Sequence, residues 1–285
     1  MITKPLVAAT DGSEESLRAV EWAAREAAVR GAPLRIVSAV QVPAMIGLQV
    51  RPDRDFVADL IHHERDQAFA AAAARAAGVA PGLQVDTVSL SGPPAQAVAG
   101  SGSRALMLVL GSRGTGAFGW LAVGSVSLYA AAHASCPVVV IRGETAAVHR
   151  QVGIGIGDLD ACASSLAFAF EEASLRKASL MAIHAVHMPA ISRGWSSAHD
   201  LAAVEADAAG QLAGLLDTWR NKYPDVPVSQ DVVHGHRGRA LVGLSARADL
   251  VVIGRHAKHP VPDPGSVRHA VLNHALAPVA VVPSS

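Results

Sequence analysis

The chain is poor in cysteine and in aromatic residues, and it carries no excess of charge. Of its 285 residues, two are cysteines and 4% are aromatic. Cys136 and Cys162 are too few and too isolated for a disulfide framework or a zinc site, which favours a reducing cytoplasm. The 24 basic side chains are scattered among 24 acidic ones, so we expect no broad surface that attracts nucleic acid.

The chain also lacks a convincing membrane segment. The stretch from Thr115 to Ile141 has no Asp, Glu, Lys or Arg and is long enough to cross a bilayer. Glycines, serines and the pair Cys136-Pro137 interrupt it, so we expect a loop, a short helix and a buried strand there. The N-terminus reaches Asp11 before a signal-peptide core is complete. We therefore expect a soluble, cytoplasmic protein that binds no membrane.

Motifs of dedicated catalysis are missing as well. The chain contains neither a G-x-S-x-G nucleophile elbow nor a G-x-x-x-x-G-K-[ST] phosphate loop. The histidine pairs His234/His236 and His256/His259 have no cysteine partner and no H-E-x-x-H spacing, so we predict no metal site and no catalytic residue.

The chain does contain an internal sequence repeat. Three segments repeat with offsets of 146, 143 and 141 residues: 21–27 at 167–173, 105–111 at 248–254, and 137–140 at 278–281. Small deletions in the second copy account for the falling offset. Because each half is long enough to bury a core of its own, we predict two domains, 1–146 and 147–285.

Short apolar runs alternate with longer helical patterns in the first copy. The runs predict strands at 5–10, 34–40, 83–89, 106–111 and 137–142, and the patterns predict helices at 13–30, 53–77 and 125–134. Runs that are continuous rather than alternating indicate strands covered on both faces, hence parallel sheets with right-handed crossovers. The predicted fold is α/β, with two tandem, doubly wound, five-stranded parallel-sheet domains of Rossmann-like type.

Glycine-rich turns follow the first and fourth predicted strands. The first strand ends at Asp11-Gly12-Ser13, the fourth at Gly111-Ser112-Arg113-Gly114, and Gly124-Ser125 opens a helix nine residues later. Phosphate oxygens need backbone N–H donors at close range, which glycines and a helix N-terminus provide. Neighbouring strands of such a sheet bring these turns together at their carboxyl ends. The sequence therefore predicts a phosphate cradle; the alternative is that the glycines merely turn the chain.

The spacing G-x-x-G-x9-G-S, with Asp11 after the first strand and Cys136-Pro137-Val138 before the last, resembles the ATP-binding type of universal stress protein. The duplication resembles that family's tandem members, and the resemblance covers essentially the whole chain. It implies ATP as the ligand, with Mg²⁺ as a candidate companion of the phosphates.

The resemblance also implies a role for each part of the cradle. Asp11 and the main chain around Ala9 and Ala39 would hold the adenine, and Leu110 and Gly111 would meet the ribose. The residues that would hold the phosphates are Gly114, Gly124, Ser125 and Val126. We add hydroxyl donors from Ser125 and Ser127 and a charge from Arg113, which could equally point to solvent. The complete set of predicted binding residues is Ala9, Thr10, Asp11, Ala39, Leu110, Gly111, Arg113, Gly114, Gly124, Ser125, Val126 and Ser127.

The function that the resemblance implies is that of a stress-response regulator or nucleotide sensor acting through an unidentified protein partner. The Val-rich strands at 137–142 and 278–282 would be exposed edges, so we expect them to pair as an intrachain pseudo-dimer. A further homodimer is expected by the same resemblance. Two hypotheses from other classes stay open: a nucleotide-independent interaction scaffold, and a slow ATPase.

The second copy departs from the nucleotide pattern. Gly157 stands at the position of Asp11, and Asp158 and Asp160 are displaced along the turn. Its loop from 254 to 265 is two residues shorter than the first, has Ala257 in place of a glycine and contains three prolines, so we expect weak or no nucleotide binding. Binding of an anion or a different nucleotide remains an alternative, because three basic residues persist: Arg255, Lys258 and Arg268.

Overall fold

The computed structural model describes residues 4–40, 54–114, 123–143, 148–186, 198–255 and 266–284. The chain divides into two compact units, Met1–Ile141 and Arg142–Ser285, called here the N-terminal and the C-terminal unit. The predicted boundary between residues 146 and 147 falls at a segment outside the described residues, so its position stays a prediction. Within the described residues, no helix is both long enough and apolar enough to span a bilayer.

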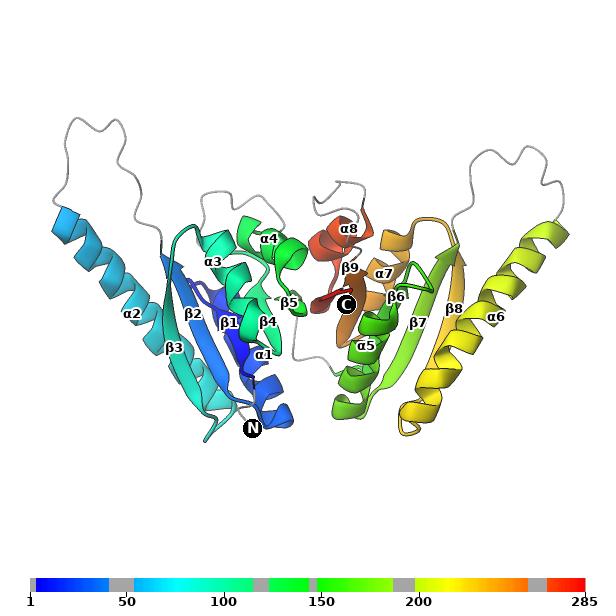
Figure 1. Cartoon of the computed structure of the whole chain (residues 1–285), viewed down its shortest axis with the longest axis horizontal. Helices are drawn as coiled ribbons and strands as arrows, with labels where there is room; N and C mark the ends of the chain where they lie inside the picture. The colour runs from blue at the N-terminus through cyan, green and yellow to red at the C-terminus, as the bar shows by residue number, and fades with distance from the viewer. Residues whose placement is uncertain are drawn as a thin grey trace, which may run out of the picture. The chain divides into compact units, whose positions relative to one another are not determined.

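The N-terminal unit is a parallel sheet whose strands alternate with helices along the chain (Figure 1). Its elements are β1 (Leu6–Ala9), α1 (Glu14–Arg30), β2 (Leu34–Val40), α2 (Arg54–Val79), β3 (Val85–Ser91), α3 (Pro94–Ser101), β4 (Met107–Gly111), α4 (Ser125–His133) and β5 (Val138–Ile141). The strand order is β3-β2-β1-β4-β5. Helices α1 and α2 contact each other, as do α3 and α4. This arrangement confirms the predicted doubly wound, parallel α/β fold.

The C-terminal unit repeats this architecture. Its elements are β6 (Gln151–Ile156), α5 (Ala163–Arg176), β7 (Ser179–Val186), α6 (Ala198–Lys222), β8 (Val228–His234), α7 (Arg237–Ser245), β9 (Leu250–Arg255), α8 (Val267–His274) and β10 (Val279–Pro283). Its strand order is β10-β9-β6-β7-β8. Read from β8 to β10, this order matches β3-β2-β1-β4-β5 of the N-terminal unit strand by strand.

Strand registers are identical in the two units. Leu6 pairs with Leu34 in the N-terminal unit, and Val152 pairs with Leu180 in the C-terminal unit, which is an offset of 146 for both partners. Leu108 pairs with Val138, and its counterpart Val251 pairs with Val279. The sequence repeat is therefore a repeat of hydrogen-bonded geometry, and positions in the two units can be compared one by one.

Continuous apolar runs form the centre of each sheet. Every residue of β4 and of β5 is buried, as expected for strands covered by helices on both faces. Helix α1 presents buried alanines to this sheet, which lets its backbone approach closely. The hydroxyl of Ser13 accepts the N–H of Ser16 at 3.3 Å and caps the start of α1, and Gly31 ends it at φ 60°.

Several element bounds differ from expectation. Strand β3 spans Val85–Ser91 rather than 83–89, β1 is shorter than the predicted 5–10, and α2 ends at Val79 rather than at residue 77. Helix α3 was not predicted, because its eight residues are mostly small and carry no clear helical periodicity. Pro94 stands at its first position, where the fixed φ of proline suits a helix start, so this residue was the available signal.

Candidate functional site

The predicted cradle lies where the sheet order of the N-terminal unit reverses. β1 and β4 are neighbours in the sheet, and the chain leaves them through α1 and α4, which continue toward opposite edges. Such a switch point leaves room for a ligand beyond the carboxyl ends of the strands. Ala9 ends β1 there, while β2 continues past its pairing with Ala9 as far as Ala39 and Val40.

Asp11 organises the turn after β1. Its Oδ1 accepts the backbone N–H of Ser13 at 3.1 Å and the Ser13 hydroxyl at 2.6 Å. Thr10 is buried, and its hydroxyl lies 3.0 Å from the Ser16 hydroxyl and accepts the N–H of Gly12 at 3.2 Å. The structure thus places Thr10 in the support of the turn, whereas the exposed Asp11 borders the site.

Gly111 is glycine because of packing. A Cβ atom at this position would lie 2.8 Å from the backbone O of Glu15, in the first turn of α1. Close packing against α1 is thus sufficient reason for a glycine at position 111, and its predicted contact with a ribose stays a prediction. Leu110 as a whole is 2% exposed, so its contact with a ribose stays a prediction.

Gly114 and Gly124 differ in the space around them. A Cβ atom on Gly114 would overlap Oδ2 of Asp11, which brings the glycine loop and the β1 turn into contact. At Gly124 the nearest atom to an added Cβ would be the Ser112 backbone O at 3.7 Å, and this same O accepts the Gly124 N–H at 2.8 Å. The structure brings Asp11, Gly114 and Gly124 to one end of the sheet, as the sequence predicted for a cradle.

Among the described residues, no side chain caps the start of helix α4. Gly124 is its N-cap residue and has no side chain that could accept the first N–H groups. Ser125 is exposed and Val126 half-buried, so the first turn of α4 is accessible. An anion at this end would satisfy the orphan donors and lie at the positive end of the helix dipole.

Besides Thr10 and Asp11, two more polar side chains of the predicted set interact with the protein. Ser127 is buried, and its hydroxyl donates to the backbone O of Gly111 at 2.7 Å. Its one hydroxyl proton is used there, so a contribution of Ser127 to a ligand would come from its backbone N–H. Arg113 is exposed, and its guanidinium lies 3.9 Å from the carboxylate of Glu15.

Acidic residues at the start of α1 are compensated by basic partners. Arg75 of α2 forms ion pairs with Glu14 at 2.8 Å and with Glu21 at 2.5 Å. Hydrogen bonds to Glu21 and Glu14 raise the pKa of Arg75 above its usual value. Glu14, in the first turn of α1, therefore presents less negative charge to an anionic ligand than the sequence suggests.

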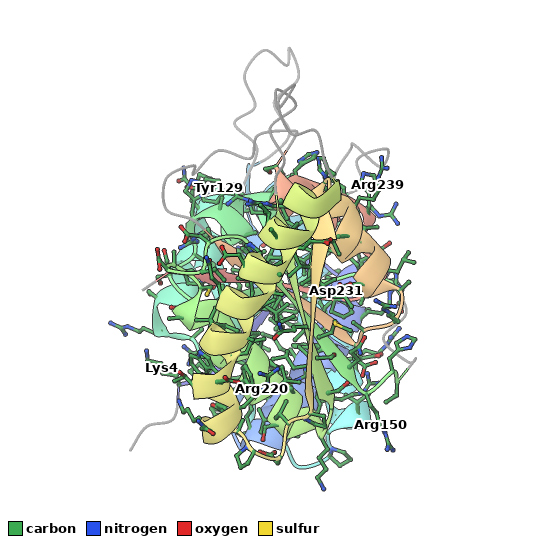
Figure 2. All side chains as sticks on the ribbon, turned by 90° about the vertical axis from the view of Figure 1, so that its right-hand side faces the viewer. Lys4, Tyr129, Arg150, Arg220, Asp231 and Arg239 are labelled. Carbon is green, nitrogen blue, oxygen red and sulfur yellow. The ribbon has the colours of Figure 1, made fainter. Side chains whose placement is uncertain are left out.

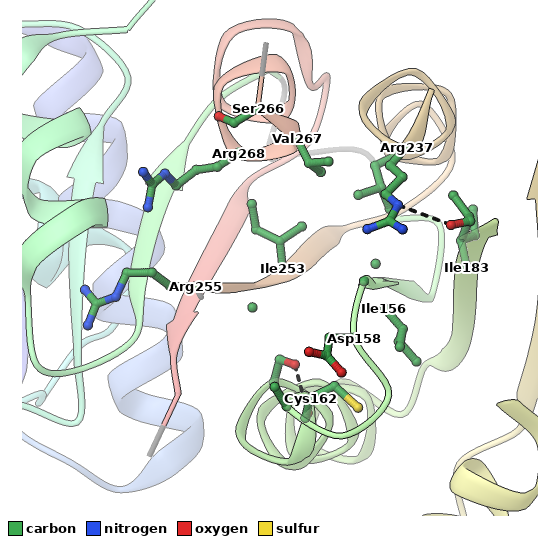
Figure 3. Close-up of a pocket in the computed structure, with 17 residues that line it drawn as sticks. Ile156, Asp158, Cys162, Ile183, Arg237, Ile253, Arg255, Ser266, Val267 and Arg268 are labelled. Atoms are coloured by element: carbon green, nitrogen blue, oxygen red, sulfur yellow. Dashed lines mark hydrogen bonds between the residues drawn. The ribbon is translucent and has the colours of Figure 1, made fainter. Parts of the chain in front are cut away.

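The C-terminal unit has a defined cavity at the corresponding place (Figure 3). Its volume is about 290 Å³, and it lies at the carboxyl ends of β6, β7 and β9 beside α5, α7 and α8. Its walls are mainly apolar, and four charged side chains line it: Asp158, Arg237, Arg255 and Arg268. The sequence singled out three of these residues but not Arg237. Aligning the two copies through α3 and α7 would have shown an arginine at the position of Pro94.

Helix α8 begins differently from α4. Ser266 is its N-cap residue, and its hydroxyl accepts the N–H of His269 at 3.2 Å. One donor that a phosphate could use is thus satisfied by the protein itself. The predicted effects of Ala257, Lys258 and the three prolines concern residues 256–265, which lie outside the described residues.

Comparison with known proteins agrees with this geometry. The model of the universal stress protein family matches residues 3–142 and again 149–283. Universal stress protein Rv2005c of Mycobacterium tuberculosis is 34% identical over 303 residues, covering 98% of this chain and 97% of that protein. A universal stress protein of Mycolicibacterium smegmatis is 31% identical over 292 residues, covering 97% and 96%.

Among solved structures, a universal stress protein from Archaeoglobus fulgidus aligns over 100% of both chains with a TM-score of 0.71 at 16% identity, which supports the fold. Two family matches, one for each unit, explain the repeated strand registers. The chain therefore belongs to the universal stress protein family and carries two tandem copies of its domain.

Proposed function

We propose that the N-terminal unit binds an adenine nucleotide, with ATP as the expected ligand, and that the chain acts as a nucleotide-responsive regulator of a stress response. The observation that carries the proposal is the uncapped first turn of α4 at Gly124, beside Gly114 and Asp11. Backbone donors without a side-chain acceptor, at the positive end of a helix, favour a phosphate.

The rest of the cradle fits the remaining parts of a nucleotide. The main chain of Ala39 extends beyond the end of β1, where a base would find backbone donors and acceptors. Asp11 is exposed at the same edge and offers a carboxylate oxygen to a base or ribose. Mg²⁺ would accompany the phosphates, since this ion commonly binds through substrate oxygens and water rather than a protein cage.

Regulation would act through the first turn of α4. A phosphate bound between Gly114 and this turn would change a surface that another protein can read. The regulator would work in the cytoplasm with an unidentified protein partner. The intrachain pseudo-dimer and the homodimer remain predictions that accompany this role.

The test is to denature the purified protein, identify any released nucleotide by mass and measure its stoichiometry. Gly114→Ala should lose the nucleotide, because the added methyl group overlaps the Asp11 carboxylate. Gly100→Ala is the matched control, since no atom lies within 4 Å of a Cβ built there.

The expected outcome is about one adenine nucleotide per chain, retained by the control and lost by Gly114→Ala. Absence of nucleotide, together with no ATP binding by calorimetry, would replace the proposal with the interaction scaffold. Steady ATP turnover abolished by Asp11→Ala in a folded protein would instead favour the ATPase.

A further inference from the structure

The cavity of the C-terminal unit has a different chemistry at the end that corresponds to the adenine position. Ala185 stands where Ala39 stands in the N-terminal unit, at the offset of 146 that the β1–β2 and β6–β7 registers share. Arg237 takes the place of Pro94, at an offset of 143. Gly92 and Gly235 support this alignment, because they precede the two helices with φ of 104° and 109°.

Arg237 hydrogen-bonds to the backbone O of Ala185, which is the acceptor that a base would need in this unit. Its Nε donates to the backbone O of Ala185 at 3.2 Å, and the guanidinium extends over the cavity from α7 (Figure 3). Within the described part of the chain, the two terminal amino groups of Arg237 make no protein hydrogen bond or ion pair. A guanidinium with two remaining N–H groups on one edge suits a carboxylate, which it can bind in a bidentate manner.

The middle of the cavity is apolar. Branched aliphatic side chains from five different segments form its walls: Ile156, Ile183, Leu241, Ile253 and Val267. A volume of about 290 Å³ is close to the lower end of the usual range for ligand pockets, which starts at roughly 300 Å³. The ligand should therefore be a small molecule with an apolar body.

Two further arginines line the side of the cavity opposite Arg237. In Figure 3 the guanidinium groups of Arg255 and Arg268 extend away from Arg237 and from the apolar walls. Burial and the neighbouring charge of Arg255 lower the pKa of Arg268. Among the described residues of the lining, Asp158 is the one acidic side chain, and it already accepts the N–H of Asp160 at 3.0 Å.

We propose that this cavity binds a small organic carboxylate with an apolar body, anchored by Arg237, instead of a nucleotide. The site is separate from the nucleotide cradle of the N-terminal unit. The tandem chain would then bind two chemically different ligands, one in each unit.

The experiment uses the full chain and saturation-transfer NMR, which detects weak binding of small ligands. Benzoate and 4-methylpentanoate are the carboxylate probes, and benzamide is the neutral probe with the shape of benzoate. We expect both carboxylates to bind and benzamide to bind at least tenfold more weakly. Equal binding of benzoate and benzamide would overturn the proposal.

Variants locate the binding. Arg237→Gln should weaken benzoate at least tenfold, and Arg237→Lys should weaken it less, because it keeps a charge without the planar fork. Arg239→Gln is the matched control on the same helix, since Arg239 is exposed and projects from the surface of the unit (Figure 2). Thermal melts followed by circular dichroism establish that each variant is folded. Benzoate binding that is unchanged in a folded Arg237→Gln would overturn the assignment.

Competition separates this proposal from the nucleotide cradle. Benzoate binding should persist at saturating ATP and in Gly114→Ala. If the N-terminal unit proves not to bind ATP, the expected binding of benzoate is unchanged. Displacement of benzoate by ATP in the Gly114→Ala background would mean that the cavity is a nucleotide site. Displacement by inorganic phosphate at equal concentration would mean that the apolar body is irrelevant, and either result contradicts the proposal.

Discussion

In the N-terminal unit, helix α4 starts at a glycine that leaves its first donors without a side-chain acceptor, whereas in the C-terminal unit Ser266 caps α8. In the N-terminal unit, α3 starts at Pro94, whereas α7 starts at Arg237, which binds the backbone O of Ala185. Strand registers do not differ between the units at any of the pairs compared. The comparison teaches that the two units share one sheet geometry and differ in the residues that begin the helices after it, and the two proposed ligands follow from that difference.

The largest expected effect concerns the glycine at the end of β4. Gly111→Ala should destabilise the protein by about 3 kcal/mol, because its Cβ would lie 2.8 Å from the backbone O of Glu15 and α1 would have to move. The counterpart Gly254→Ala should change stability by less than about 1 kcal/mol, since the nearest atom is the Ser165 hydroxyl at 3.4 Å. Urea denaturation of both variants measures the difference. Equal destabilisation would mean that the units do not differ here.

Exchanging the residues that start α3 and α7 tests the ligand comparison itself. Pro94→Arg should lower ATP affinity roughly tenfold, equivalent to about 1.4 kcal/mol, because a guanidinium would compete for the main chain at Ala39. Arg237→Pro should abolish benzoate binding while keeping α7, since proline is favourable at the first helical position. Calorimetry and ligand NMR measure the two affinities. ATP affinity unchanged by Pro94→Arg would show that the base does not use this edge.

A smaller effect is expected at the caps of the last helices. Ser266→Ala should cost about 1 kcal/mol of stability, because the N–H of His269 loses its acceptor. Ser125→Ala, at the equivalent position of the repeat, should change stability by less than about 0.5 kcal/mol, since Ser125 is exposed and does not cap α4. Thermal unfolding of both variants measures this contrast. Matching losses would indicate that Ser125 caps α4 after all.

Much of the fold followed from the sequence because the strongest signals lie in buried strands. Continuous apolar runs such as Met107 to Leu110 have few alternatives to a strand covered on both faces. The internal repeat also allowed each predicted element to be checked against its counterpart in the other copy. Helix α3 escaped prediction because its small side chains give little periodicity.

The candidate site was less accessible to sequence reasoning. The turn residues Asp11, Gly114 and Gly124 could be placed together, because strand order brings them to one edge. The packing reason for Gly111 depends on how closely α1 passes, and the use of the Ser127 hydroxyl depends on the position of α4. The contact from Arg237 to Ala185 joins residues 52 positions apart, which spacing alone does not reveal.

The shared strand registers have a consequence for how such a chain evolves. The offset between the copies falls from 146 to 143 between β2 and β3 and to 141 between β4 and β5, so length changes fell in connections rather than in strands. After duplication, one copy can therefore gain or lose loop residues and acquire a new specificity, while its hydrogen-bonded ladder and buried core stay unchanged. In a duplicated sheet of this kind, the loops of one copy can change their binding specificity without a change in the strands that keep the domain folded.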